Sequence, residues 1–356
     1  MNTLRASLRQ HRALLLIVFA YAAAVGFVVG GVATLHDSVR IMSGLLITTL
    51  LGAVFALCGY AIYVMLMLRP DRLCHYLYHV LRRYLSRERL LQALPVLLLI
   101  PVFAASFTTF KTAIPRLHPY TWDSTLAAWD LVLHGGTAPW AWLQPLLGHP
   151  WVTGLLNVSY HLWFFLFYAM IYWLALDTRR PLLRMQFLLS FVLSWIILGS
   201  IAAMLFSSVG PCYYGHLHDS DPYAPLMAYL HEANHHFPIW ALSVQDMLWQ
   251  DYQSRGASSE LGISAMPSMH VATAVLMALL GWRVSRTAGL ALSVFAMLIM
   301  LGSVHLGWHY ALDGYAGAAG AALVWHAVGR MLRAGGVSVS TLGAAAPCMS
   351  KGGLLS

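Results

Sequence analysis

Long uncharged stretches of apolar residues recur along the chain and dominate its hydrophobic pattern. Each can cross about 30 Å of bilayer hydrocarbon, which takes about 20 helical residues. The stretches are rich in Leu and Ala without the period-two alternation of strands, and a helix satisfies its own backbone hydrogen bonds in lipid. The pattern predicts an all-α, polytopic membrane bundle with about eight transmembrane helices, at residues 13–35, 41–68, 90–110, 151–176, 185–209, 264–282, 287–304 and 309–329.

Three of these segments depart from a simple apolar helix. Residues 41–68 exceed the length needed to cross a bilayer, so we expect tilt or an end in the interface. Pro95 and Pro101 interrupt the third segment. The segment 264–282 reaches spanning length only by including polar residues near its start.

Composition and charge place the chain in a membrane. Only 10% of its 356 residues are charged and 59% are apolar, too few polar groups to cover a soluble protein. With the N-terminus inside, 17 of the 21 basic residues fall in inner segments, a bias that the positive-inside rule turns into an orientation. The net charge of +8 therefore does not imply a nucleic-acid partner. We expect an integral protein of a bacterial inner (cell) membrane, with both termini cytoplasmic.

The basic N-terminus, with Arg5, Arg9 and Arg12 before an apolar run, also resembles a signal peptide. The small residues 22–24 imitate a cleavage site. The run is too long for the apolar part of a signal peptide and lacks a convincing end, so we interpret it as a membrane anchor.

The chain divides into a two-span N-terminal region with a basic cytoplasmic loop (1–89), a membrane domain (90–333) and a tail rich in Gly, Ala and Ser (334–356) that we expect to be disordered. Within the membrane domain, residues 111–150 and 207–263 form long extracytoplasmic segments.

Each large loop has its own pattern. In 111–150, four apolar residues share one helical face, which predicts a helix along the interface: Leu126, Trp129, Val132 and Leu133. The loop 207–263 is rich in histidine and acid, but it lacks a convincing partner for metal binding. On the inside, 69–92 predict an Arg-rich surface helix in contact with anionic lipid.

Ionisable residues at the ends of membrane spans indicate function, because they are costly at membrane depth. One group, Met266 to His270, opens the sixth span, and a second, His305 to Asp313, opens the eighth. The chain crosses the membrane inward and back between them, so both emerge as neighbours on the outer face. His309 and Asp313 are four residues apart, which puts them one above the other on a helix. The aspartate can then hold one imidazole nitrogen and leave the other free to attack or to accept a proton.

Cations are scarce on the predicted outer side, where only four basic residues fall. Lys111 and Arg116 directly follow the third span, on the same membrane face as the histidines, and Arg255 precedes the Pro-Ser-Met-His turn by about a dozen residues. All three are candidates to neutralise a phosphate oxyanion.

Over roughly residues 105–325, the chain resembles the type 2 phosphatidic acid phosphatase superfamily, most closely its inositol phosphorylceramide synthase-like branch. The resemblance rests on Phe110 to Arg116 with the following Trp122-Asp123, on Pro267-Ser268-Met269-His270, and on His309-Tyr310-Ala311-Leu312-Asp313. It implies a six-helix catalytic core and a two-step phosphoryl transfer without metal or cofactor.

By the same resemblance, His309 is the nucleophile that forms a phosphohistidine, Asp313 orients it, and His270 protonates the leaving oxygen. Lys111, Arg116, Ser268 and the backbone amides after Pro267 hold the phosphoryl oxygens. The implied substrate is a lipid phosphate or phospholipid. The acceptor stays open between water and an alcohol such as inositol or a lipid hydroxyl, and the sequence does not indicate an oligomeric state.

One position departs from the family pattern. Six residues before the nucleophilic histidine the phosphatases carry an arginine, and here the residue is Ser303. Arg255 or His305 can compensate, and the lipid-transferase branch tolerates a similar absence, which favours transfer over hydrolysis. His305 is four residues before His309, so an exchange of their roles stays open.

A non-enzymatic transporter or haem-binding protein is the alternative. Haem ligation favours paired histidines at mid-span, whereas most of the 17 histidines here lie at span ends or in loops. Transport favours inverted repeats and broken helices, which the sequence does not display.

Overall fold

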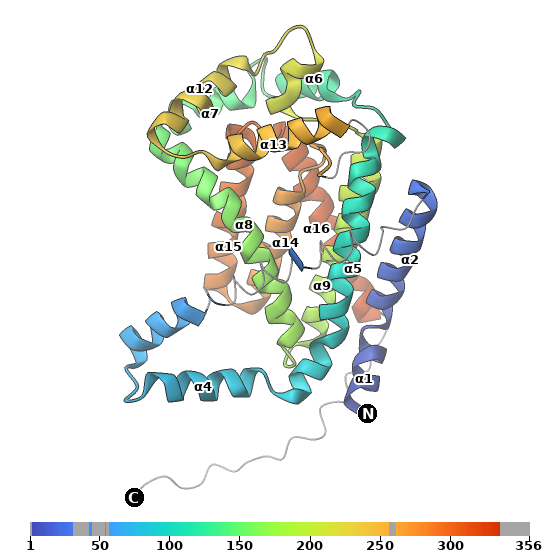
Figure 1. Ribbon diagram of the computed structural model, residues 1–356, viewed down its shortest axis with the longest axis vertical. Coiled ribbons are helices and arrows are strands. Elements are labelled where there is room, and N and C mark those ends of the chain that lie inside the picture. Colours follow the sequence, from blue (N-terminus) through green and yellow to red (C-terminus); the bar gives the residue numbers. More distant parts are fainter. Residues whose placement is uncertain (1, 31–42, 45–53, 55–56, 256–260, 335–356) are drawn as a thin grey trace, which may run out of the picture.

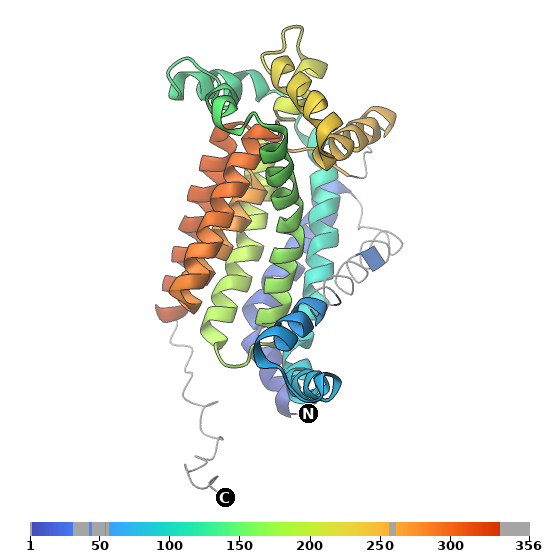
Figure 2. The same cartoon turned by 90° about the vertical axis from the view of Figure 1, so that its left-hand side faces the viewer.

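The computed structural model describes residues 2–30, 43–44, 54, 57–255 and 261–334. Long helical rods along the long axis of the molecule form a bundle, and shorter helices lie across its two ends (Figures 1 and 2). The rods are α2 (Arg12–Val29), α5 (Arg87–Leu117), α8 (Pro150–Leu176), α9 (Pro181–Ile196) continued by η2 (Ile197–Ala202) and α10 (Ala203–Leu205), α14 (Met269–Val284), α15 (Arg286–His305) and α16 (Ala311–Ala334).

Five helices in the described part of the chain are long and apolar enough to cross a membrane. They correspond to the first, third, fourth, fifth and seventh predicted spans: Arg12–Val29, Arg87–Leu117, Pro150–Leu176, Pro181–Leu205 and Arg286–His305. The protein is therefore an integral membrane protein. Much of the first half of the second predicted span, 41–68, lies outside the described residues, and its end is the short apolar helix Leu57–Leu68, which includes η1 (Val64–Leu68).

The predicted interruption of the third span is wrong. Helix α5 continues through Pro95 and Pro101 to Leu117. Proline removes one backbone hydrogen bond, and neighbouring helices compensate for that loss inside a membrane bundle. Pro95 is buried, and α5 packs against α2 and α8, which hold it on both sides.

The sixth predicted span is shorter than expected, because 264–268 precede the helix. With 16 residues, α14 is about 24 Å long, whereas α8 has 27 residues and is about 40 Å long. The beginning of α14 lies beside the middle of α8 and not beside its beginning. This is shown by His270, which packs on Tyr160 about 15 Å along α8.

A cap covers the end of the bundle where α14 and α16 begin (Figure 2). It consists of α6 (Asp123–Leu133), α7 (Pro139–Leu147), η3 (Pro211–Tyr213), α11 (Tyr214–Leu217), α12 (Ala224–His236) and α13 (Trp240–Arg255). The helix predicted along the interface is α6. Of its four apolar residues, Leu126 is buried, while Trp129, Val132 and Leu133 are exposed.

The opposite end carries α1 (Asn2–Gln10) and α4 (Leu73–Tyr84). Helix α4 lies crosswise to the bundle and has no buried residue, as expected for a surface helix within 69–92 (Figure 1). Helix α16 runs from the cap to this end, where α1 also lies. The two ends of the described chain therefore lie at the same end of the bundle.

Candidate active site

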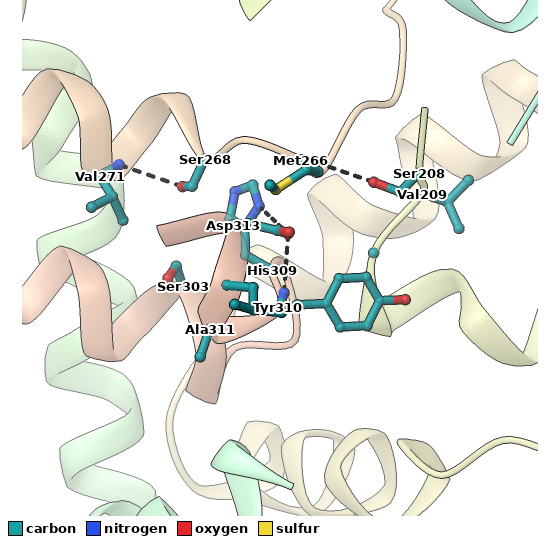
Figure 3. A network of polar contacts seen from close by, with 12 residues as sticks. Ser208, Val209, Met266, Ser268, Val271, Ser303, His309, Tyr310, Ala311 and Asp313 are labelled. Carbon is teal, nitrogen blue, oxygen red and sulfur yellow. Dashed lines mark hydrogen bonds and ion pairs between the residues drawn. The ribbon is translucent and has the colours of Figure 1, made fainter. Parts of the chain in front are cut away.

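The Pro-Ser-Met-His motif forms the beginning of α14 and is attached directly to α16. Ser268 is the N-cap residue, and its hydroxyl accepts a hydrogen bond from the Val271 amide at 3.4 Å (Figure 3). The Ser268 amide donates to the backbone carbonyl of Asp313 at 2.9 Å. The amide and the hydroxyl of Ser268 are therefore already hydrogen-bonded within the protein. Of the backbone amides after Pro267 that the resemblance assigns to phosphate binding, those of Met269 and His270, the first two of the helix, are left for this role.

We expected His309 on the helix, but it lies in the loop before α16, because the helix begins at Ala311. The predicted contact with Asp313 nevertheless forms. Oδ2 of Asp313 lies 3.3 Å from Nδ1 of His309 and accepts the Tyr310 amide at 3.1 Å (Figure 3). The second bond is that of a capping box, in which an acid in the first turn reaches back to the N-cap amide. One buried carboxylate thus caps the beginning of α16 and orients the imidazole.

Helix α6 supplies a second cap to α16 from outside the motif. Asp130 accepts hydrogen bonds from the amides of Ala311 and Leu312 at 2.8 and 3.0 Å. These are the first two amides of α16, which have no partner within a helix. The loop that carries His309 is therefore held by the cap as well as by its own helix.

Asp123, seven residues earlier on α6, ties the same loop to a second segment. It accepts the amides of Val209 and Gly210 at 2.9 to 3.2 Å and the hydroxyl of Tyr310 at 2.8 Å. Burial raises the pKa of the Asp123 and Asp130 carboxyls, and the backbone hydrogen bonds they accept oppose that rise.

Residues 207–212 connect all three sequence motifs. Ser207 accepts the amides of residues 121 and 122 through its carbonyl, and Ser208 accepts the amides of 265 and 266 through its carbonyl and hydroxyl. The Cys212 amide donates to the carbonyl of Gly307. Gly210 has a positive φ of 95°, and a Cβ there would lie 2.6 Å from the carbonyl oxygen of Trp308. This position therefore requires glycine.

His270 faces His309 across the site, with 6.3 Å between ring centroids. Two aromatic rings of α8 hold it from behind. The centroid of Tyr160 lies 4.4 Å away with the rings nearly parallel, and that of Trp163 lies 4.2 Å away. The two imidazoles predicted to meet do lie together at one end of the bundle.

The structure separates the side chains of two of the three predicted cations. Lys111, half-buried in α5, lies within electrostatic range of His270. Arg116 is exposed five residues further on, so its side chain points about 140° away from that of Lys111. Arg255 ends α13, and its side chain lies outside the described part. The structure thus places Lys111 near His270 and leaves Arg116 on another helix face.

His305 lies behind the site and is fully buried. Its Nε2 is 2.9 Å from the hydroxyl of Thr153, which in turn contacts the Tyr229 hydroxyl at 2.7 Å. Ser303 is also fully buried, and its hydroxyl donates to the Met300 carbonyl. His305 is therefore turned toward α8, and Ser303 offers no cation to a phosphate.

A pocket opens beside His309 toward the cap. Its walls come from α6, α7, α12 and the loop before α16, and they include Asp130, Trp140, Tyr223, Leu226 and His309. Within the described residues, no group of three His, Cys, Asp or Glu side chains is placed to hold a metal ion, the histidines of α12 included.

Comparison with protein families decides between the enzymatic and non-enzymatic interpretations. The model of the PAP2 superfamily matches residues 124–327, more than half of the chain. The chain belongs to the PAP2 superfamily. This membership implies a phosphatase-type enzyme that acts on phosphate esters. Neither curated proteins nor solved structures gave a match.

The PAP2 match contains Ser268, His270, His305, His309 and Asp313, but it begins after Lys111 and Arg116. It does not resolve the branch of the superfamily. The residues that sequence reasoning missed are Asp130, the connector around Ser208, and Tyr160 with Trp163. Only the two acids carried a signal, since Asp123 and Asp130 are two turns apart on one face of an apolar helix.

Proposed function

We propose that this PAP2 protein transfers a phosphoryl group from a lipid phosphate or phosphodiester through a phosphohistidine at the extracytoplasmic face. The observation that carries the proposal is the placement of the His309–Asp313 pair opposite His270. Because a carboxylate accepts, Nδ1 of His309 carries the proton in that contact, and the lone pair of Nε2 is left for attack on phosphorus.

In the first step, Nε2 of His309 bonds to phosphorus while the bond between phosphorus and the leaving oxygen breaks. His270 donates a proton to that oxygen. Asp313 stabilises the positive charge that develops on the imidazole of His309, as an acid does in other nucleophile–base pairs.

In the second step, the acceptor hydroxyl gives its proton to His270 and its oxygen bonds to phosphorus. The bond between phosphorus and Nε2 of His309 then breaks. Water as acceptor gives hydrolysis, and an alcohol such as inositol or a lipid hydroxyl gives transfer.

The charge around the phosphoryl group favours transfer from a phosphodiester, which has one negative charge. Lys111 is half-buried near His270, whereas Ser303 replaces an arginine with a neutral, buried side chain. Among the described residues, Lys111 is the cation near His270, and one cation compensates a monoanion more fully than a phosphomonoester dianion. The inositol phosphorylceramide synthase-like branch is therefore the part of the superfamily that we propose for this chain.

The test is purified protein with a panel of lipid phosphates and phosphodiesters in EDTA, followed for phosphate release and for new phospholipid together. Substrate labelled in the phosphoryl group should transfer label to the protein in an acid-labile, alkali-stable form typical of phosphohistidine. His309→Ala should lose both turnover and label. Wild-type turnover without label, or turnover retained by His309→Ala, contradicts the proposal.

A further inference from the structure

Several buried polar atoms around His270 and His309 have no hydrogen-bond partner among the described residues. They include the hydroxyl of Tyr160, Nε1 of Trp308 and Oδ1 of Asp313. Buried donors are nearly always paired in native proteins, because an unpaired donor is destabilising. Two donors and one acceptor left unpaired beside the imidazoles indicate a group that completes them when the enzyme works.

Tyr160 lies between the two parts of the site. One face of its ring packs against His270 at 4.4 Å, and its ring is within 6° of parallel to that of Trp308, with centroids 6.4 Å apart. Its hydroxyl is buried and interacts electrostatically with Cys212 and with the Asp313 carboxylate. A single side chain of α8 therefore packs on the proposed proton donor and carries a buried hydroxyl without a partner among the described residues.

We propose that Tyr160 is a positioning and phosphoryl-binding residue. Its ring holds His270, and its hydroxyl, together with the indole N–H of Trp308, donates hydrogen bonds to phosphoryl oxygens. This inference rests on the proposed function. The two neutral donors take the phosphate-binding role of the family arginine that Ser303 replaces. Hydrogen bonds to an anionic oxygen are stronger than those between neutral groups.

The deciding measurement is the affinity of full-length protein in detergent for orthovanadate, a phosphate analogue. Tyr160→Phe keeps the ring on His270 and removes only the hydroxyl. We expect its dissociation constant to rise about 10- to 100-fold, as for a lost hydrogen bond to a charged group. Tyr21→Phe is the matched control, because it removes a buried tyrosine hydroxyl of α2 that is hydrogen-bonded to Ser200 of η2 and does not contact the two histidines. Its affinity should equal that of wild type.

Trp308→Phe removes the second donor and is the deciding variant if Tyr160→Phe does not fold. Unchanged vanadate affinity in a folded Tyr160→Phe or Trp308→Phe, with wild-type binding intact, overturns this inference and leaves the proposed function standing. A wild-type protein that neither binds vanadate nor turns over any ester overturns both. A purely packing role of the ring predicts that Tyr160→Phe, which keeps the ring, changes neither the melting temperature nor the vanadate affinity, and that result overturns the phosphoryl-binding role.

Discussion

The Asp130 carboxylate lies 2.8 Å from the amide nitrogen of Ala311, a residue 181 positions later in the chain. It is an N-cap supplied by a different helix, because Ala311 begins α16 and Asp130 lies on α6. His309 is two residues before that amide. Helix α6 therefore helps to position the proposed nucleophile, His309.

Asp130→Ala should impair activity more than stability. Loss of a capping aspartate costs about 0.5–2 kcal/mol. Releasing the loop before α16 moves His309 relative to His270, so we expect turnover to fall at least about tenfold, since small misplacements of reacting groups are expensive. Glu232→Ala, which removes an exposed acid of the same cap, is the control. Near-normal turnover in folded Asp130→Ala excludes this role.

Much of the site could be predicted because its central contacts are local. Residues 270 and 309 meet through one helical hairpin, and His309 and Asp313 are close in sequence. The contacts of Asp123 and Asp130 could not be predicted, since the sequence of α6 does not indicate that these acids bind the backbone amides of residues 209 and 311. The start of α14 was also misplaced. An apolar stretch shows how long a helix can be, but the turn at Ser268 is set by its bond to Asp313.

Asp313→Asn should leave the fold intact and slow the reaction by about 10²- to 10⁴-fold. The amide can still accept the Tyr310 hydrogen bond, but it does not stabilise the charge that develops on His309. Single-turnover phosphorylation measures this loss directly. If the rate of label transfer falls less than about threefold, Asp313 does not orient the nucleophile.

His305→Ala distinguishes the two histidines at the end of α15 and the following loop. His305 is bonded to Thr153 and does not contact Asp313, so it should not be the residue that is phosphorylated. We expect this variant to be less stable and still to take up label from substrate. Tandem mass spectrometry of the labelled wild-type protein should place the phosphoryl group on His309. Label on His305 reverses the assignment.

EDTA should leave turnover unchanged, because the proposed chemistry uses imidazoles, Lys111 and amides to handle charge. The measurement is initial rate before and after exhaustive dialysis against chelator, with readdition of Mg²⁺, Mn²⁺ or Zn²⁺. Loss of activity that any of these ions restores contradicts the metal-free mechanism.

Gly317→Ala tests whether the close contact between α16 and α14 positions His270. A Cβ at Gly317 would lie 2.5 Å from the carbonyl oxygen of Ser268, and that oxygen accepts the Ala272 amide within α14. The clash is with backbone, so α14 must shift as a unit, at a cost of about 1–3 kcal/mol. His270 shifts with it, and turnover should fall although the residue itself makes no contact with substrate. Gly154→Ala is the control, because its Cβ would meet Phe237 at an ordinary 3.4 Å. If both glycine variants keep wild-type turnover, the spacing of α14 and α16 does not limit the reaction.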